Sequence, residues 1–224
     1  MSACTIVRGQ DIKLSVQSIA VPDQTFALNQ VEAFLSQYKA KKVLPALIKR
    51  RAAVALILRY RTDEPEVLLM KRAHRKGDRW SGQVSMPGGR EEDEDESIVE
   101  TAVRETMEEL GVDLNSHGRY LANLDDVRAV AKSQVLPMSI TPCAFIVESD
   151  PQITLGDEAS DAFWLPLLPV AAGEFDGTYH FKMGPTSLKM PCWEYQGHTI
   201  WGLTHKMLSG FIDLLKSWSG SNMV

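Results

Sequence analysis

Residues 86–112, MPGGREEDEDESIVETAVRETMEELGV, constrain this chain more than any other stretch, because they join a glycine pair, an acidic loop and a glutamate-rich segment with helix signals at both ends. Ser97 can cap the first turn of a helix, and Glu100, three residues later, can reach back as the second half of a capping box. Gly111 is typical of a helix C-terminus. The sequence therefore predicts a helix between Ser97 and Gly111.

This predicted helix has two faces. Its apolar residues recur at helical spacing and should face the core: Val99, Val103, Met107 and Leu110. Glu105, Glu108 and Glu109 are three and four positions apart and lie on roughly the opposite face. Crowded carboxylates repel one another unless a cation lies among them, and oxygen ligands at this density suit Mg²⁺ or Mn²⁺. The alternative is a solvated acidic face, the usual state of a glutamate-rich helix.

The stretch resembles the signature of the Nudix hydrolases, Gly-x5-Glu-x7-Arg-Glu-U-x-Glu-Glu-x-Gly-U, where U is apolar. The matching positions are Glu96, Arg104, Glu105, Glu108, Glu109, Leu110, Gly111 and Val112. Thr106 replaces the commonest aliphatic residue, and the loop between Gly89 and Glu96 is one residue longer than in the signature. The coenzyme A pyrophosphatase branch has the same longer loop, Pro-Gly-Gly-x-x-Asp-x-x-Asp, and here Glu92 and Asp95 occupy the two acidic places.

A second motif of that branch lies upstream, approximately Leu-Leu-Thr-x-Arg-Ser/Ala, a basic residue, then Gly-x3-Phe-Pro-Gly-Gly. Residues 68–73 read LLMKRA and residues 82–89 read GQVSMPGG, so the framework is similar. Met70 and Met86 replace the threonine and the phenylalanine, and the stretch between the two halves is one residue longer, with Arg79 nearest to the basic position. These changes leave the catalytic residues in place but can alter the choice of substrate.

The resemblance implies a set of roles around one to three Mg²⁺ or Mn²⁺ ions. The expected metal ligands are the Gly88 carbonyl, Glu105, Glu108 and Glu109. Glu105 or Glu108 would accept the proton from the attacking water, unless a base from outside the signature does so. Arg104 would orient the helix carboxylates through an ion pair, and Glu96 would brace the preceding loop.

Residues 72–80, RAHRKGDRW, form a basic loop immediately before the acidic stretch. Arg72, Arg75 and Arg79 could bind the substrate phosphates that the metal does not neutralise. The alternative is a solvated loop that balances the neighbouring acids. Glu158 is a candidate for the distal carboxylate that, in many Nudix enzymes, adds a metal contact or positions the water, and its alternative is an exposed loop glutamate.

The pattern of the rest of the chain predicts one α/β domain. With 224 residues and 44% apolar residues, a single core is the simplest organisation. We expect residues 1–48 to be an extension with one helix, from Asp23 to about Lys41, and residues 49–220 to form the domain.

Strands are expected over 52–60 and 67–71, as a hairpin, and over 120–123, 139–147 and 162–167. Residues 173–192 read as an irregular stretch or a long hairpin, and a last helix begins near residues 200–204, with Trp201 in the core. The resemblance implies the Nudix fold, an α/β/α sandwich with a mixed β-sheet.

Composition limits the partners. A net charge of −5 argues against a nucleic-acid partner bound through its phosphates. Cys4, Cys143 and Cys192 are odd in number and widely spaced, which favours reduced thiols. The apolar runs are too short to span a membrane, and no secretion, mitochondrial or peroxisomal signal is recognisable. We expect a cytoplasmic protein with a small-molecule nucleotide substrate and leave a homodimer open.

These observations predict a metal-dependent pyrophosphohydrolase that cleaves a nucleoside diphosphate derivative. The leading substrate is coenzyme A or acyl-coenzyme A, cut to 3′-phosphoadenosine 5′-phosphate and (acyl-)4′-phosphopantetheine. Alternative substrates are ADP-ribose, dinucleotides such as NADH, and oxidised nucleoside triphosphates. An alternative of another class is a Nudix-fold regulator that binds a nucleotide without cleaving it. Such a module has no need of all three glutamates, and all three are present.

Overall fold

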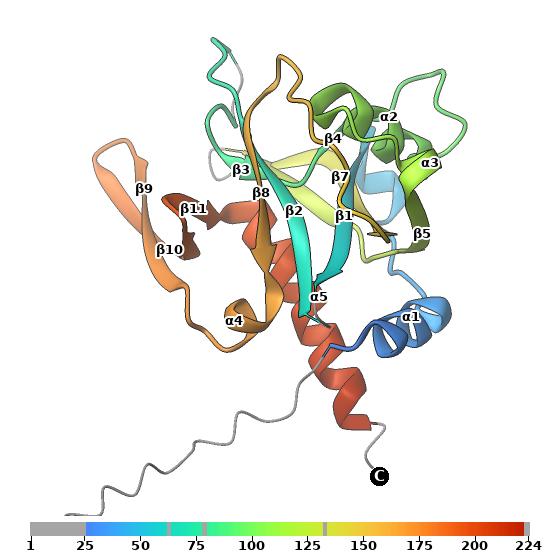
Figure 1. Ribbon diagram of the computed structural model, residues 1–224. Coiled ribbons are helices and arrows are strands. Elements are labelled where there is room, and N and C mark those ends of the chain that lie inside the picture. The colour runs from blue at the N-terminus through green and yellow to red at the C-terminus, as the bar shows by residue number, and fades with distance from the viewer. Residues whose placement is uncertain (1–25, 62–63, 78–79, 132–133, 222–224) are drawn as a thin grey trace, which may run out of the picture.

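The computed structural model describes residues 26–61, 64–77, 80–131 and 134–221, and its centre is a mixed β-sheet with helices on both faces (Figure 1). Within the described residues the sheet has eight strands in the order β3-β2-β1-β7-β5, with β4 paired to β1, β6 to β7 and β8 to β2. Their bounds are β1 Arg50–Arg61, β2 Glu64–Arg72, β3 Val84–Ser85, β4 Gly88–Arg90, β5 Gly118–Asn123, β6 Val127–Ala131, β7 Gln134–Val147 and β8 Ala159–Pro166.

The central strand β1 is the apolar run of the sequence, and its side chains are buried on both faces from Ala55 to Leu58. It pairs antiparallel with β2, which confirms the predicted hairpin, and parallel with β7. Burial on both faces explains why the run is continuous rather than alternating. The strand therefore has a helical layer on each side.

Strands β1 and β2 diverge beyond their hairpin, and the two short strands that lead into the acidic loop pair with them. Met70 of β2 pairs with Ser85 of β3, and Val54 of β1 pairs with Gly88 of β4. A side chain at Gly88 would place its Cβ 2.2 Å from the carbonyl oxygen of Ala53, so only glycine fits there. The glycine pair is thereby fixed against the central strand.

Two apolar clusters fill the layers above and below the sheet. One lies under α2 Ile98–Leu110 and α3 Leu114–His117, and the other lies under α1 Leu28–Gln37 and α5 Gly202–Ser221. Two short helices, η1 Pro45–Leu47 and α4 Leu167–Ala171, lie between the longer elements. The predicted α/β/α sandwich with a mixed sheet is confirmed.

A second, three-stranded antiparallel sheet projects from the body beside β8 (Figure 1). It consists of β9 Asp176–Met183, β10 Thr186–Tyr195 and β11 His198–Trp201, so residues 173–192 include most of a long hairpin. His198 of β11 stacks on Phe163 of β8 at 4.2 Å between ring centroids, which attaches this sheet to the body. Trp201, expected in the core, is only half-buried.

The N-terminal helix is shorter than predicted. It spans Leu28–Gln37 rather than continuing to Lys41, and Asp23, the predicted cap, lies outside the described residues. Residues 38–43 have no regular secondary structure and bind a pair of aspartates instead. Tyr38 Oη and the Lys41 N–H donate to Asp125, each at 2.7 Å, and the Val43 N–H donates to Asp126. These tertiary bonds replace the last turn of the helix.

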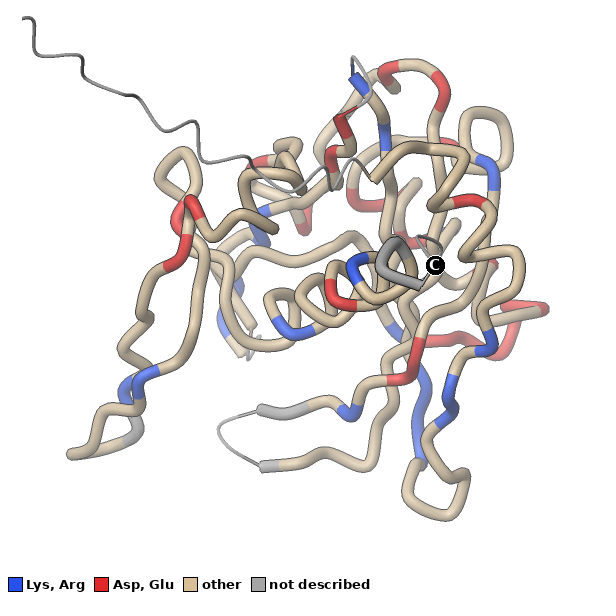
Figure 2. Tube along the Cα trace, turned by 90° about the horizontal axis from the view of Figure 1, so that it is seen from below, with Lys and Arg blue, Asp and Glu red and all other residues tan. Residues whose placement is uncertain are grey.

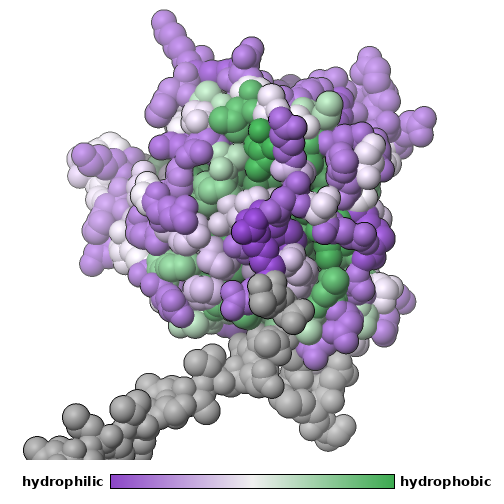
Figure 3. All heavy atoms as spheres, in the orientation of Figure 1, coloured by the Kyte–Doolittle hydropathy of each residue, from purple (hydrophilic) through white to green (hydrophobic). Residues whose placement is uncertain are grey.

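The surface carries hydrophilic side chains around its margin, with apolar patches toward the centre of the face in Figure 3. No helix in the described part of the chain combines the length and the apolar character needed to cross a membrane. Cys143 and Cys192 are buried free thiols, and Cys4 lies outside the described residues.

Candidate active site

Helix α2 begins and ends at the residues that the sequence predicts. Ser97 Oγ accepts the Glu100 N–H at 3.2 Å, and Gly111 adopts a left-handed conformation with φ +65°. Glu100 reaches back one residue further than a capping box requires, and accepts the Glu96 N–H at 2.6 Å. The two caps fix where the glutamates of the helix lie relative to the glycine pair.

The predicted division of α2 into separate apolar and acidic faces is wrong. Met107 is 53% exposed, whereas Glu109 is only 2% exposed. The face on the sheet consists of small and polar residues together with Glu109 and two aliphatic residues, namely Ile98, Thr101, Ala102, Thr106, Glu109 and Leu110. Thr106 is tolerated in this face because its hydroxyl donates to the Ala102 carbonyl of the preceding turn at 2.7 Å. Helix α2 therefore buries one of its glutamates against the sheet.

The buried Glu109 is bound to the glycine pair. Its Oε2 accepts the Gly88 N–H at 2.8 Å, and its Oε1 lies 3.5 Å from Nη1 of Arg72. Burial raises the pKa of Glu109 to about 8, despite the Gly88 N–H and the positive charge of Arg72, which act in the opposite direction. The carboxylate thus occupies a position where an additional positive charge would stabilise its ionised form.

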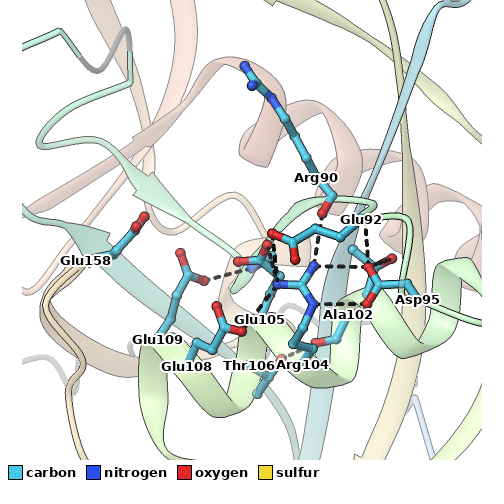
Figure 4. A network of polar contacts seen from close by, with 12 residues as sticks. Arg90, Glu92, Asp95, Ala102, Arg104, Glu105, Thr106, Glu108, Glu109 and Glu158 are labelled. Carbon is cyan, nitrogen blue, oxygen red and sulfur yellow. Dashed lines mark hydrogen bonds and ion pairs between the residues drawn. The ribbon is translucent and has the colours of Figure 1, made fainter.

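Glu105 lies against the second glycine. A Cβ at Gly89 would be 2.2 Å from Oε1 of Glu105, so the absence of a side chain makes room for the carboxylate. Burial raises the pKa of Glu105 as well. Glu108, with its side chain 57% exposed, is the outermost of the three, and Figure 4 shows the three glutamates side by side on α2.

Arg104 links the helix to the acidic loop, but its main partner is Asp95 rather than a helix glutamate (Figure 4). Asp95 accepts Nε at 2.9 Å and Nη2 at 3.0 Å, while Nη1 contacts Glu105 at 3.1 Å and Glu108 at 3.3 Å. The hydrogen bonds from Arg104 hold the pKa of Asp95 well below its usual range. Within the described residues, Glu96 makes no hydrogen bond or ion pair to Arg104, and its backbone N–H donates to Glu100 instead.

The loop carboxylate that binds Arg104 is Asp95, one residue before Glu96, which the sequence had predicted to brace the loop. The Asp95 side chain is 3% exposed and also accepts Thr101 Oγ1 at 2.8 Å and the Glu92 N–H at 3.0 Å. The available signal was the acidic pair Glu92 and Asp95 in the lengthened loop. Counting from Gly89, five residues intervene before Asp95, so the extra residue follows the bracing carboxylate instead of preceding it.

The described part of the basic loop brings Arg72 and Arg75 to the site. Arg72 lies between Glu109 and Glu158, with Nη2 3.5 Å from Glu158 Oε2, and Arg75 Nη1 donates to Glu158 Oε1 at 2.8 Å. The Ala73 N–H also donates to the Glu158 carbonyl at 2.8 Å, which holds the two segments together. Glu158 thus faces the α2 carboxylates (Figure 4), and Arg79 lies outside the described residues.

The donor set fits a hard divalent cation. Carboxylate side chains gather on one side of the glycine pair, and burial raises the pKa of two of them, Glu105 and Glu109. Among the described residues, no cysteine or histidine side chain belongs to this cluster of carboxylates. In the present side-chain positions the glutamates are bound to Arg72, Arg104 and Gly88. No three acidic, histidine or cysteine side chains of the described residues converge on one point. A cation would be bound after these carboxylates exchange an arginine partner for the metal.

Comparison with known proteins places the site in a family. The family model of the NUDIX domain matches residues 49–180. An uncharacterized protein of Schizosaccharomyces pombe is 34% identical over 152 residues, 59% of this chain and 46% of that protein. The mitochondrial coenzyme A diphosphatase of Homo sapiens is 31% identical, with 67% of this chain and 63% of that protein covered. The chain thus spans between about half and two thirds of the length of these two curated relatives.

A shorter relative is matched over most of its length. The uncharacterized Nudix hydrolase NudL of Escherichia fergusonii is 30% identical over 182 residues, 78% of this chain and 88% of that protein. Among solved structures, the Ap4A hydrolase of C. elegans is 19% identical with a TM-score of 0.46, covering 55% of this chain and 85% of that one. Because the family model spans more than half of the chain and NudL is matched almost throughout, this protein belongs to the Nudix family.

Proposed function

We propose that this protein is a divalent-metal-dependent pyrophosphohydrolase that cleaves the diphosphate linkage of coenzyme A or an acyl-coenzyme A. The observation that carries the proposal is the placement of Glu105, Glu108 and Glu109 beside the glycine pair, with Arg72 directly adjacent. A diphosphate needs both positive charge and a proton acceptor near its phosphorus atoms, and this arrangement offers both.

The metal would be held by the three α2 glutamates and the Gly88 carbonyl. Mg²⁺ or Mn²⁺, when bound there, would supply neutralising charge to the diphosphate oxygens. Arg72 would contact a phosphate oxygen once it is released from Glu109, and Arg75 would do so at the outer edge of the site. Glu158, now paired with both arginines, would be freed by the same exchange and could then position the water.

In the reaction, the oxygen of water forms a bond to phosphorus and the bridging P–O bond breaks. Glu105 or Glu108 accepts the proton that the water loses, and the leaving phosphate departs as an anion. Arg104 positions both carboxylates and is itself fixed by Asp95. The catalytic geometry would therefore depend on the acidic loop as well as on the helix.

The choice of coenzyme A is supported by the upstream motif and by the name of the human relative. The two substitutions in that motif, Met70 and Met86, are 0% and 1% exposed and pack in the core. Such residues act on a ligand only through their neighbours, so the residues of the motif that reach the site, Arg72 among them, still support this substrate. ADP-ribose, dinucleotides and oxidised nucleoside triphosphates are the alternatives.

The proposal is tested by chromatographic product analysis after incubation with Mg²⁺ or Mn²⁺. The panel contains coenzyme A, acetyl-coenzyme A, ADP-ribose, NADH and 8-oxo-dGTP, and Glu109→Gln is the blank. We expect phosphopantetheine and 3′-phosphoadenosine 5′-phosphate from coenzyme A with the wild type alone. Cleavage of another compound instead would support the pyrophosphohydrolase reaction but contradict coenzyme A as the substrate. No cleavage of any compound would favour a regulator that binds a nucleotide without cleaving it.

A further inference from the structure

The β9–β11 sheet carries an aromatic face that the catalytic roles above do not use. Residues directly paired across strands lie on the same face of a sheet. The register pairs Tyr179 with Met190, Phe181 with Leu188 and Trp201 with Cys192, so these six side chains share one face. We call it the hairpin face.

Three aromatic rings form a continuous row on the hairpin face. Tyr179 stacks on Trp201 at 4.3 Å between centroids with an interplanar angle of 26°, and Phe181 lies 5.4 Å from the same indole. All three residues are half-buried, and Leu188 at the distal end is 40% exposed. An aromatic row that is still partly open to solvent offers flat surface for stacking with a planar ring.

The position of the hairpin face relates it to the active site. Strand β11, which contributes Trp201, lies between β10 and β3 in Figure 1. The buried Thr204, just after β11, donates to the Val84 carbonyl of β3 at 2.9 Å. Strand β3 in turn leads within three residues to Gly88, which binds Glu109. The aromatic row and the catalytic carboxylates are therefore joined through one short, hydrogen-bonded segment.

The part of the hairpin near its turn favours an anionic ligand. Residues 177–191 contain Lys182 and Lys189 and no acidic residue, whereas Asp176 and Glu194 lie at the opposite end of strands β9 and β10. Both lysines are exposed. Figure 2 shows basic residues, in blue, near the end of the projecting hairpin. Because successive side chains of a strand point to opposite faces, both lysines face away from the aromatic row. They would therefore attract a phosphorylated ligand through their long-range electrostatic field and not by direct contact with it.

We infer that the hairpin face binds the adenine of the nucleotide substrate, with the base stacked on the row of Tyr179, Trp201 and Phe181. An aromatic surface is complementary to the planar base of a nucleotide, and the lysines on the opposite face of the same hairpin add a positive field that favours its anionic groups. This inference rests on the proposed function for the identity of the substrate. It assigns base recognition to the projecting sheet and leaves the chemistry to α2.

The test is isothermal titration of AMP and of ribose 5-phosphate, which lacks the base, into the metal-free protein in EDTA. The variants are Tyr179→Leu and Phe181→Leu, which remove a ring but retain apolar volume. Tyr179→Phe retains the ring, and Thr178→Ala is the matched control on the other face of the same strand. Thermal melting verifies that each variant is folded, and gel filtration measures its oligomeric state.

We expect the wild type to bind AMP more tightly than ribose 5-phosphate. Each leucine variant should weaken AMP binding about 5- to 150-fold, the range that loss of one base–aromatic stack produces, with ribose 5-phosphate unaffected. Tyr179→Phe and Thr178→Ala should bind AMP like the wild type. Coenzyme A hydrolysis by the leucine variants should show a raised KM with little change in kcat.

Equal binding of AMP and ribose 5-phosphate by the wild type, or unchanged AMP binding in both leucine variants, would overturn the inference. A change of oligomeric state in these variants with unchanged AMP affinity would instead assign the hairpin face to a second copy of the chain. Failure of the proposed function is distinguishable, because the AMP titration needs no turnover. A protein that hydrolyses nothing yet loses AMP binding in the leucine variants retains the hairpin site.

Discussion

Arg104 is fixed by a carboxylate from the loop before its own helix, and this single contact joins the two halves of the site. Asp95 accepts two of its N–H groups and is almost completely buried, so the pair is shielded from solvent on one side. Charged hydrogen bonds of this kind contribute about 1.5–3 kcal/mol each when they are well formed. The position of Arg104, and through it of Glu105 and Glu108, therefore depends on Asp95.

We expect Asp95→Asn to lower the free energy of unfolding at pH 7 by about 2 kcal/mol, because a charged acceptor of Arg104 is lost. Its matched control, Glu96→Gln, should change that free energy by less than about 0.5 kcal/mol, since the Glu96 side chain is exposed. Urea denaturation measures both. A loss of unfolding free energy in Glu96→Gln as large as that in Asp95→Asn would contradict the assignment of the bracing role to Asp95.

The pH dependence of the Asp95 contribution has a defined sign. Its folded pKa is lowered, so its stabilisation is present above the unfolded pKa of about 3.9 and is lost as the pH falls toward the folded value. The stability difference between wild type and Asp95→Asn should accordingly shrink below about pH 4. A difference that persists in acid would mean that shape, and not charge, makes Asp95 important.

At this scale the sequence predicted which residue types form the site but not how deeply they lie. The spacing of Glu105, Glu108 and Glu109 is a local property, and it placed them together on α2. The burial of Glu109 depends on the small side chains of Thr101 and Ala102, both 0% exposed, which let the helix pack closely on the sheet. That approach is tertiary, so the helical pattern alone assigned Met107 to the core instead.

Among the elements, α1 is joined to the body by apolar contacts and by the aspartate pair that follows β5. Val31 and Leu35 are buried, and Phe34 lies 5.5 Å from Trp218 of α5 between ring centroids. We propose on this basis that residues 26–48 fold together with residues 49–220. The hydrogen bond from Tyr38 to Asp125 is one of the polar contacts that follow the end of the helix.

Tyr38→Phe should lower the free energy of unfolding by about 1 kcal/mol at pH 7, the usual contribution of one hydrogen bond. Burial, with a smaller effect of Asp125, raises the pKa of Tyr38 from 10.0 to about 12. A raised pKa means that the stabilisation is complete below pH 10 and is lost as the pH rises toward 12. Urea denaturation of both proteins from pH 7 to 12 should show the difference disappearing, and a constant difference would exclude this bond.

The elements predicted from sequence are those with a strong local signal. The apolar run in β1, the paired runs of β2 and β7, and the capped α2 were all recognised. Strand β6 was not among the predicted strands, and it forms through antiparallel pairing with β7. The sequence did not decide between an irregular stretch and the hairpin of β9 and β10, because Gly177, Gly184 and two prolines weaken the strand pattern there.

At the scale of the whole molecule, the sheet separates two tasks. Helix α2 covers one face and carries the carboxylates, while α5 and α1 cover the other and β9–β11 projects at the side (Figure 1). The diverging strands β1 and β2 bring the glycine pair from the sheet to the helix. We therefore expect metal binding and turnover to depend on α2 and its glycine pair together.

The most direct test is titration of Mn²⁺ into the metal-free protein, followed calorimetrically, with turnover measured on the same samples. The wild type should bind Mn²⁺ and hydrolyse its substrate only when metal is present. Glu109→Gln should lose Mn²⁺ affinity and turnover by at least about tenfold each while remaining folded, since its buried carboxylate already has a raised pKa. Glu94→Gln, an exposed acid of the adjacent loop, is the control and should retain both. Equal Mn²⁺ affinity in the wild type and Glu109→Gln would contradict the metal site on α2.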